Sequence, residues 1–259
     1  MSAAGGLKGK VALITGAGRG IGAATARHLA ELGASVAVTD VVIDGAQDVA
    51  DEIMASGGDA VAIALDCGVA DSIAAGVDEA AARLGGLDLL DHNAGWTSFS
   101  RDIDAESVDL DVWQQVLDIN VRGGLLLFRA ALPHFRRRGG GAVVFISSGS
   151  AATGELRRVA YGVSKAGVEQ LVRHLGARYG AEGIRTNAIA PGFIMTQTAA
   201  SAIDEESRDL LATQNPLKRL GTPEDIASVV GFLLSDAAGF VNGQVLRVDG
   251  GLTISPRLG

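Results

Sequence analysis

A chain of 259 residues with a formal net charge of −8 is long enough for a substantial core and too acidic for a general nucleic-acid surface, since phosphate binding needs a basic face. Apolar residues make up 47% of the chain but aromatic residues only 4%, which indicates a soluble globular protein with close helix-and-sheet packing. The single cysteine, Cys67, excludes an intrachain disulfide framework. Because Met1–Lys10 lacks an apolar signal segment and no run of about 18 apolar residues occurs, we expect a cytoplasmic protein without a membrane span.

Short apolar strand candidates alternate with longer helical patterns, which is the order expected of successive βαβ units. The predicted strands are Val11–Ile14, Val36–Thr39, Ala60–Leu65, Leu87–His92, Ala142–Ser147, Arg185–Ala190 and Val245–Val248. The predicted helices are Ile21–Leu32, Ala46–Ala55, Ser72–Leu84, Val112–Arg137, Tyr161–Tyr179 and Pro223–Leu234. Near-continuous apolar strands indicate an α/β fold whose parallel sheet is covered on both faces.

Several boundaries have identifiable causes. Gly33 directly follows the first predicted helix and suits a C-terminal position with positive φ. Thr222-Pro223-Glu224-Asp225 offers an N-cap, a proline at the first helical position and an acid for a capping box. Residues Gln197–Asn215 follow the strand that ends near Ala190, where ligands bind in such sheets, so we expect a short helical lid there.

Three glycines separate the first predicted strand from the first helix in the order G-x-x-x-G-x-G, at Gly16, Gly20 and Gly22. Without side chains there, the backbone can approach a pyrophosphate at the helix N-terminus, although a tight turn alone would also use glycine. Asp40 ends the second strand, where a carboxylate can accept hydrogen bonds from both adenosine ribose hydroxyls. Because this carboxylate repels a 2′-phosphate, NAD is favoured over NADP. Arg19 is the contrary signal, but we interpret it as a solvated loop residue or a pyrophosphate neighbour.

Tyr161 and Lys165 are four residues apart on a predicted helix, so the ammonium group can stand beside the phenol. A free phenol titrates near pH ~10 and is a poor base at neutrality. A nearby cation favours the phenolate and lowers that pKa. Ser148 follows a predicted strand and would hold the oxygen that the tyrosine protonates or deprotonates. We interpret Ser147 as a strand residue satisfied by the backbone, and Ser150 as a pocket residue without a chemical step.

Five motifs in order carry a family resemblance. Thr15–Gly22 looks like the loop T-G-x-x-x-G-x-G, Asp66 like an adenine-contacting aspartate, and His92-Asn93-Ala94-Gly95 like N-N-A-G. Asn120, Ser148, Tyr161 and Lys165 match a catalytic tetrad, and Pro191-Gly192 with Thr196 matches P-G-x-x-x-T. From Lys10 to Leu252 the chain therefore resembles the short-chain dehydrogenase/reductase family. The resemblance implies a single Rossmann-type domain over residues 1–259, with a doubly wound sheet of about seven strands, assembled as a homotetramer.

The resemblance also implies a role for each residue of the tetrad. Tyr161 would be the general acid or base, Ser148 would orient the substrate oxygen, and Lys165 would bind the nicotinamide ribose and lower the tyrosine's pKa. Asn120 would hold a water that links Lys165 to solvent. The expected cofactor-binding residues are Gly16, Arg19, Gly20, Ile21, Gly22, Asp40, Asp66, Cys67, Asn93, Ala94, Gly95, Tyr161, Lys165, Pro191, Gly192, Ile194 and Thr196. The expected substrate pocket comprises Ser148, Ser150, Trp96 and Phe193.

Two polar residues end the fourth predicted strand and depart from the family motif. His92 replaces the first asparagine of N-N-A-G, and Asp91 stands at a position that is usually apolar. Buried polar groups need partners, so we interpret the two as a structural pair or as bonded to neighbouring loops. The alternative is that His92 is a third titrating group near the nicotinamide.

The predicted function is interconversion of a secondary alcohol and a ketone, with NAD as cofactor, a small-molecule substrate and no metal. One alternative is an NADPH-dependent 3-oxoacyl-[acyl-carrier-protein] reductase that docks its acidic carrier on Arg136-Arg137-Arg138, although cations at a helix C-terminus also complement the helix dipole. Another is a non-catalytic NAD-binding regulator, which would not need the aligned tetrad. Arg157 and Arg158 could receive an anionic substrate, but we interpret both as solvated loop residues.

Overall fold

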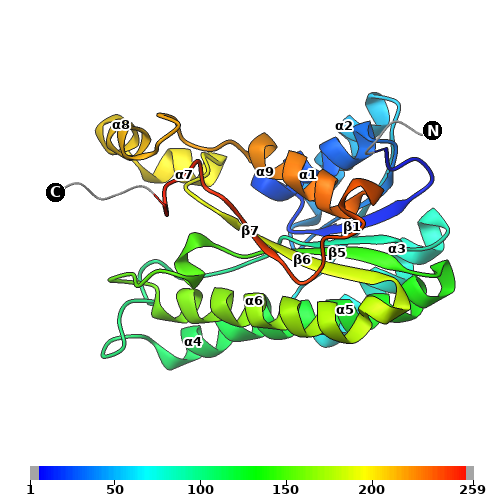
Figure 1. The fold of residues 1–259 in the computed structure, drawn as a ribbon, viewed down its shortest axis with the longest axis horizontal. Helices are drawn as coiled ribbons and strands as arrows, with labels where there is room; N and C mark the ends of the chain where they lie inside the picture. The colour runs from blue at the N-terminus through cyan, green and yellow to red at the C-terminus, as the bar shows by residue number, and fades with distance from the viewer. Residues whose placement is uncertain (1–5, 255–259) are drawn as a thin grey trace.

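Seven parallel strands form one sheet in the computed structural model, which describes residues 6–254 (Figure 1). The strands are β1 (Val11–Thr15), β2 (Ser35–Asp40), β3 (Asp59–Ala64), β4 (Leu89–His92), β5 (Gly141–Ile146), β6 (Ile184–Pro191) and β7 (Val245–Val248). Their order is β3-β2-β1-β4-β5-β6-β7, and every neighbouring pair is parallel. Because the chain runs one way from β1 to β3 and the other way from β4 to β7, the direction reverses between β1 and β4. Ligands bind at such a point, outside the carboxyl ends of the strands.

Helices cover both faces of the sheet (Figure 1). One face carries α1 (Gly20–Glu31), α2 (Ile43–Ala55) and α9 (Pro223–Leu234), and α1 packs closely on α9. The other face carries α3 (Ala70–Leu84), α4 (Leu110–Leu117), α5 (Gly123–Arg138) and α6 (Val159–Tyr179). Two further helices, α7 (Gln197–Ala202) and α8 (Glu205–Gln214), follow β6 and lie at one end of the sheet, where the lid was expected. Among the helices in residues 6–254, none combines the length and apolarity needed to span a bilayer.

Each face of the sheet has its own apolar core. Ile14 and Val144 belong to the core under α1 and α9, whereas Leu13 and Phe145 belong to the core under α3, α5 and α6. Successive side chains of a strand point to opposite faces, which is why these strands are apolar at nearly every position. The doubly wound Rossmann-type sheet predicted from the sequence is therefore confirmed.

The predicted helix Val112–Arg137 is helical throughout, but a π-helical turn at Asp118–Arg122 divides it into α4 and α5. Asn120 lies in this turn, and its amide donates to the Trp96 carbonyl at 3.0 Å and to the Ser164 hydroxyl at 2.9 Å. A π turn inserts an extra residue into a helix and is found frequently at functional sites. The apolar periodicity continues through the turn, so the sequence pattern did not reveal it.

Two predicted helix boundaries are confirmed. Gly33 has a φ of +94° just after α1. At the start of α9, the Thr222 hydroxyl accepts a hydrogen bond from the Asp225 amide at 3.3 Å, and the Asp225 carboxylate accepts one from the Thr222 amide at 2.8 Å. These reciprocal bonds are the predicted capping box.

Candidate active site

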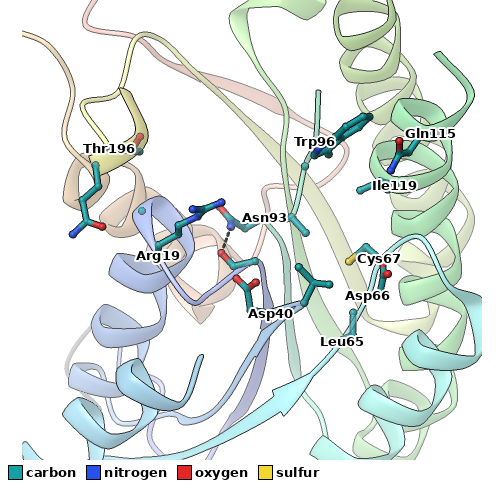
Figure 2. Close-up of a pocket in the computed structure, with 16 residues that line it drawn as sticks. Arg19, Asp40, Leu65, Asp66, Cys67, Asn93, Trp96, Gln115, Ile119 and Thr196 are labelled. Carbon is teal, nitrogen blue, oxygen red and sulfur yellow. Dashed lines mark hydrogen bonds between the residues drawn. The ribbon is translucent and has the colours of Figure 1, made fainter. Parts of the chain in front are cut away.

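A cavity of about 450 Å³ lies at the carboxyl ends of the central strands. Figure 2 shows Thr196 on one side of it, Asp66, Cys67 and Ile119 on the other, and Asn93 and Asp40 between them. The predicted residues that line the cavity are Gly16, Arg19, Gly20, Asp40, Asp66, Cys67, Asn93, Ala94, Gly95, Trp96 and Thr196. The structure therefore brings together residues from the ends of β1 to β4 and from the segment after β6.

The glycine loop is held closely against the end of β4. Gly16 has a φ of +63°, and a Cβ there would lie 3.0 Å from the Ala94 Cα. The Asn93 amide donates to the carbonyls of Thr15 and Gly16, both at 3.0 Å. Gly20 also has positive φ, at +59°, so both turns of the loop favour glycine.

Asp40 ends β2 and faces this loop. Its Oδ2 accepts a hydrogen bond from the Gly18 amide at 3.0 Å, and its Oδ1 accepts one from the Val42 amide at 3.0 Å. The first turn of α1 contains no acidic residue, and Arg19 caps the helix without a side-chain hydrogen bond. Free amides and glycines at a helix N-terminus fit a pyrophosphate, and the Asp40 carboxylate fits a ribose diol. The residues present therefore fit a dinucleotide.

Asp66 and Cys67 follow β3 and line the far side of the cavity. The Asp66 carboxylate accepts a hydrogen bond from the Gly68 amide at 2.8 Å, and its own amide donates to the Ser72 hydroxyl at 2.9 Å. Burial raises the pKa of the Cys67 thiol to about 12, so the thiol stays protonated and is not a nucleophile. Within residues 6–254, no group of three or more His, Cys, Asp and Glu side chains is placed to hold a metal ion.

Tyr161, Lys165 and Ser148 come together at the start of α6. The Lys165 ammonium lies 5.5 Å from the centre of the Tyr161 ring and donates to the Ile146 carbonyl at 2.7 Å. Burial lowers the pKa of Lys165 to about 8. Burial also raises the pKa of Tyr161, while a hydrogen bond with Ser148 and the charge of Arg158 act in the opposite direction. Arg158 is thus a second cation beside Tyr161, in addition to Lys165, which the sequence predicts as the cation that lowers the tyrosine's pKa.

Ser148 belongs to a chain of side-chain hydrogen bonds. Its hydroxyl accepts from the Ser150 amide at 3.2 Å and donates to the Ser150 hydroxyl at 3.1 Å. The Ser150 hydroxyl donates in turn to the Glu155 carboxylate. The Ser147 hydroxyl is not part of this chain of hydrogen bonds and instead donates to the Glu169 carboxylate at 3.1 Å.

Asn120 is buried beside Lys165. Its Oδ1 accepts a hydrogen bond from the Trp96 amide at 2.7 Å, in addition to the two bonds donated by its Nδ2. A Cβ at Gly95 would lie 3.1 Å from the Lys165 Nζ and 3.7 Å from the Asn120 Oδ1, so both polar groups approach this glycine. Asn120 therefore fixes the backbone of the cavity wall at Trp96.

Asp102 is a functional residue that no motif in the sequence predicts. It is fully buried, and its carboxylate accepts hydrogen bonds from the backbone amides of Ala160 at 2.9 Å and Tyr161 at 3.0 Å. The Thr97 hydroxyl donates to the same carboxylate at 2.9 Å. A carboxylate at a helix N-terminus satisfies free amides and complements the helix dipole. Asp102 thus holds the first turn of α6, which carries Tyr161, although no sequence motif marks it.

Asp91 and His92 do not pair with each other, but His92 has partners in neighbouring segments, which was the other form of the interpretation. The His92 Nδ1 lies 3.3 Å from the Thr15 hydroxyl, and its Nε2 lies 3.4 Å from the Asn120 carbonyl. Asp91 belongs to the opposite face of β4, and its carboxylate has no hydrogen-bond partner among the described residues. Burial lowers the pKa of His92 to about 4 and raises that of Asp91 to about 8.

Replacing His92 by Asn should leave the pH profile of turnover unchanged above about pH 5. Burial keeps the imidazole neutral in this range, because its pKa is lowered to about 4. The measurement is kcat/KM against pH for both proteins. Loss of an ionisation from the profile of His92→Asn would show that His92 titrates during the reaction.

Some predicted residues lie outside the main cavity. Gly192, Phe193 and Ile194 line a second cavity of about 140 Å³ together with Asn215, Leu217, Arg219, Gly221, Asp225, Val248, Asp249 and Gly250. Pro191 ends β6. Ile21 packs against the apolar core, and a Cβ at Gly22 would collide with the Gly16 carbonyl. Ile21 and Gly22 therefore shape the glycine loop from within α1.

Five residues of the main cavity were not predicted: Val41, Leu65, Gln115, Ile119 and Gln197. Val41 and Leu65 directly follow β2 and β3, so the rule that ligands bind at the carboxyl ends of parallel strands could have found them. Gln115 and Ile119 come from α4 and the π turn, and no local signal in the sequence points to them.

The fold and this site are typical of one class of oxidoreductases. A family model described as enoyl-(acyl carrier protein) reductase matches residues 16–253. The chain is 42% identical over 244 residues to cis-4-hydroxycyclohexanecarboxylate dehydrogenase of Sinomonas cyclohexanicum, covering 94% of this chain and 96% of that protein. It is 38% identical over 245 residues to 7α-hydroxysteroid dehydrogenase of Escherichia coli K12, covering 95% and 94% of the two chains.

A solved structure shares the fold. The complex of a 7α-hydroxysteroid dehydrogenase with NADH and 7-oxo glycochenodeoxycholic acid superimposes with a TM-score of 0.90 at 37% identity, covering 95% of each chain. The chain therefore belongs to the short-chain dehydrogenase/reductase family. It is an oxidoreductase of this family that interconverts a secondary alcohol and a ketone.

Proposed function

We propose that the protein is an NAD(H)-dependent dehydrogenase of ring-bearing secondary alcohols in which Tyr161 is the acid or base. The main support is that the Tyr161 phenol, the Ser148 hydroxyl and the Lys165 ammonium lie close together, next to a cavity that fits a dinucleotide. A pure binding module would not need these three groups together, which argues against the non-catalytic regulator.

The side chains divide the work of the reaction. A bound nicotinamide would supply the acceptor for the hydride of the carbinol carbon. The alcohol gives its hydroxyl proton to the Tyr161 phenolate, and Ser148 holds the same oxygen through its hydroxyl. Lys165 binds the nicotinamide ribose, and its pKa of about 8 leaves it mostly charged at neutral pH. Asn120 holds the Trp96 backbone beside Lys165 and, as the resemblance implies, a water that leads to solvent.

Asp40 supports NAD over NADP. Its carboxylate lies beside the glycine loop and in the cavity, where a 2′-phosphate would meet a negative charge. Arg19 also lines the cavity, but it has no ion pair among residues 6–254 and is free to approach a pyrophosphate.

Replacing Asp40 by Ala should lower the ratio of kcat/KM for NAD⁺ to that for NADP⁺ by about 10- to 100-fold, because charged hydrogen bonds to the ribose are lost and a repulsion is removed. The initial rate of nicotinamide reduction with each cofactor measures this ratio. Asp44→Ala is the matched control, since Asp44 is an exposed carboxylate of α2 outside the cavity. A strong preference of the unmodified protein for NADP⁺ would contradict the assignment.

The proposal that the substrate hydroxyl sits on a saturated ring is supported by the names of two relatives. One acts on cis-4-hydroxycyclohexanecarboxylate and another on a 7α-hydroxysteroid, and both of these are secondary alcohols on a saturated ring. A panel of cyclohexanols, steroids and open-chain secondary alcohols with NAD⁺ tests the assignment. Turnover of the open-chain alcohols alone would contradict it.

The intrachain partners of three arginines argue against the carrier-protein alternative. The three arginines that would receive the carrier are engaged within the chain: Arg136 pairs with Glu182, Arg138 pairs with Asp88, and Arg137 bonds to the His134 ring.

We further propose a single domain and a cytoplasmic homotetramer, as the resemblance implies. Exposed apolar side chains of Leu110, Leu125 and Val163, on helices α4 to α6, support assembly through this face.

A further inference from the structure

Arg158 lies directly over the catalytic tyrosine. Its guanidinium carbon is 5.1 Å from the centre of the Tyr161 ring and 5.6 Å from the centre of the Phe99 ring. The side chain is only 28% exposed, whereas the neighbouring Arg157 is exposed. The sequence-based interpretation of both arginines as solvated is therefore wrong for Arg158.

The backbone at Arg158 is held in an unusual conformation. Its φ of +65° and ψ of +46° lie in the left-handed region, which a non-glycine residue adopts at a cost. Its amide donates to the Asp102 carbonyl at 3.0 Å, and its carbonyl accepts from the Gly162 amide at 3.0 Å. Asp102, which also holds the amide of Tyr161, thus sets the positions of the arginine and the tyrosine together.

Glu155 occupies one edge of the guanidinium and leaves another open. Its Oε2 accepts from the Arg158 Nε at 3.1 Å and from Nη2 at 2.7 Å, while its Oε1 accepts from the Ser150 hydroxyl. The Nη1 atom has no hydrogen-bond partner among the described residues. A guanidinium carries five donors in a planar fork, so the edge formed by Nη1 and Nη2 can bind a second carboxylate through two parallel bonds.

The open edge of the Arg158 guanidinium lies close to the two groups that would hold the substrate oxygen, Tyr161 and Ser148. Arg158 stacks on Tyr161, and Glu155 leads through Ser150 to Ser148. The two hydrogen bonds from Arg158 to Glu155 fix the orientation of the fork, and the ion pair adds no net negative charge at the site. A substrate whose hydroxyl reaches Tyr161 and Ser148 would then bring its other substituents near Arg158.

We infer that Arg158 binds a carboxylate of the substrate, so that the substrates of this enzyme are hydroxycarboxylic acids and the matching oxo acids. The inference rests on the proposed function, because it names the substrate class of the same site. Arg158 acts here as a specificity-determining residue, and the acid or base remains Tyr161.

The test compares hydroxycyclohexanecarboxylates with the carboxamides of the same rings, using NAD⁺ and the unmodified protein. We expect a higher kcat/KM for the carboxylate of at least one pair. Arg158→Gln should lower the carboxylate-to-carboxamide ratio by about 10- to 100-fold, as expected for lost hydrogen bonds to a charged group. Any effect of the variant on Tyr161 itself affects both substrates and cancels in the ratio.

Two further variants keep the result interpretable. Arg158→Lys should retain part of the preference, because an ammonium keeps the charge but not the fork. Arg157→Gln, an exposed neighbour with the same change, should leave the ratio as it is in the unmodified protein. NADH binding by each variant, followed by fluorescence titration, shows that the protein is folded.

The outcomes separate the inference from the proposed function. Equal kcat/KM for carboxylates and carboxamides, or a ratio that neither Arg158→Gln nor Arg158→Lys changes, overturns the inference while turnover with NAD⁺ still supports the dehydrogenase. Absence of NAD⁺ reduction with every secondary alcohol overturns the proposed function, and the inference with it.

Discussion

Tyr161→Phe is expected to lower kcat by about 10³-fold, which is within the range of general acid–base catalysis, and to leave NADH binding nearly unchanged. The phenylalanine keeps the ring that lies beside Lys165 and Arg158 but lacks the hydroxyl that exchanges the substrate proton. Steady-state rates in both directions and a fluorescence titration with NADH measure the two effects.

The chain provides a matched control for this change. Its second tyrosine, Tyr179, lies at the other end of α6, where its ring packs 5.0 Å from Phe128. Tyr179→Phe makes the same substitution in the same helix and should retain activity. Near-normal turnover by Tyr161→Phe would show that another group transfers the proton.

The two directions of the reaction should depend differently on pH. Burial raises the pKa of Tyr161 above its usual range, so the phenol is protonated at neutral pH. Alcohol oxidation needs the phenolate and should therefore become faster as the pH rises. Ketone reduction needs the phenol and should not become faster over the same range.

Asp91→Val is expected to raise the melting temperature by about 10 °C at pH 7, since about 1 kcal/mol moves a domain of this size by a few degrees. Asp91 faces the apolar core between Ile14 and Val144, and neither carboxylate oxygen has a partner among the described residues. Keeping it protonated at pH 7 costs on the order of 4 kcal/mol, which is the distance from its ordinary pKa of 3.8 to pH 7. Valine removes this cost and fills the same space with apolar atoms.

The sign of the accompanying pH effect follows from the raised pKa. The folded protein keeps the Asp91 proton up to about pH 8, and the unfolded chain loses it near pH 3.8. The stability of the unmodified protein should therefore be greatest below about pH 4 and fall until about pH 8, as far as this group determines it. Asp91→Asn cannot titrate and should remove that slope while keeping an unpaired polar group. Lower stability of Asp91→Val, with the slope intact, would contradict the account.

Much of the fold could be predicted because the pattern that forms it is local. β7 and α9 begin and end where the sequence predicted, and the other strands differ from their predicted bounds by one or two residues. Continuous apolar strands between glycine, proline and helix-cap signals are enough to place these elements. The π turn at Asp118–Arg122 escaped prediction because it depends on the bonds of Asn120 to Trp96 and Ser164, which are distant in sequence.

The site was predicted where residue type and chemistry coincide. A glycine loop, a carboxylate at a strand end and a Tyr-Lys pair each carry a chemical meaning that spacing reveals. The spacing of Asp102 and Arg158 in the sequence indicates no chemical role for either residue. The role of Asp102 depends on its burial at the start of a helix, and that of Arg158 on a left-handed backbone conformation. Asp91 was assigned a partner by the general rule that buried polar groups pair, and in this structure that rule does not hold.

We propose hydride transfer to NAD⁺ from a secondary alcohol on a saturated ring, with Tyr161 as the base. To test this step, the protein is incubated with NAD⁺ and a cyclic alcohol deuterated at the carbinol carbon, and the mass of the nicotinamide product is recorded. We predict reduced cofactor that carries one deuterium, and almost none from Tyr161→Phe. Reduced cofactor without deuterium, or equal yield from Tyr161→Phe, would contradict the account.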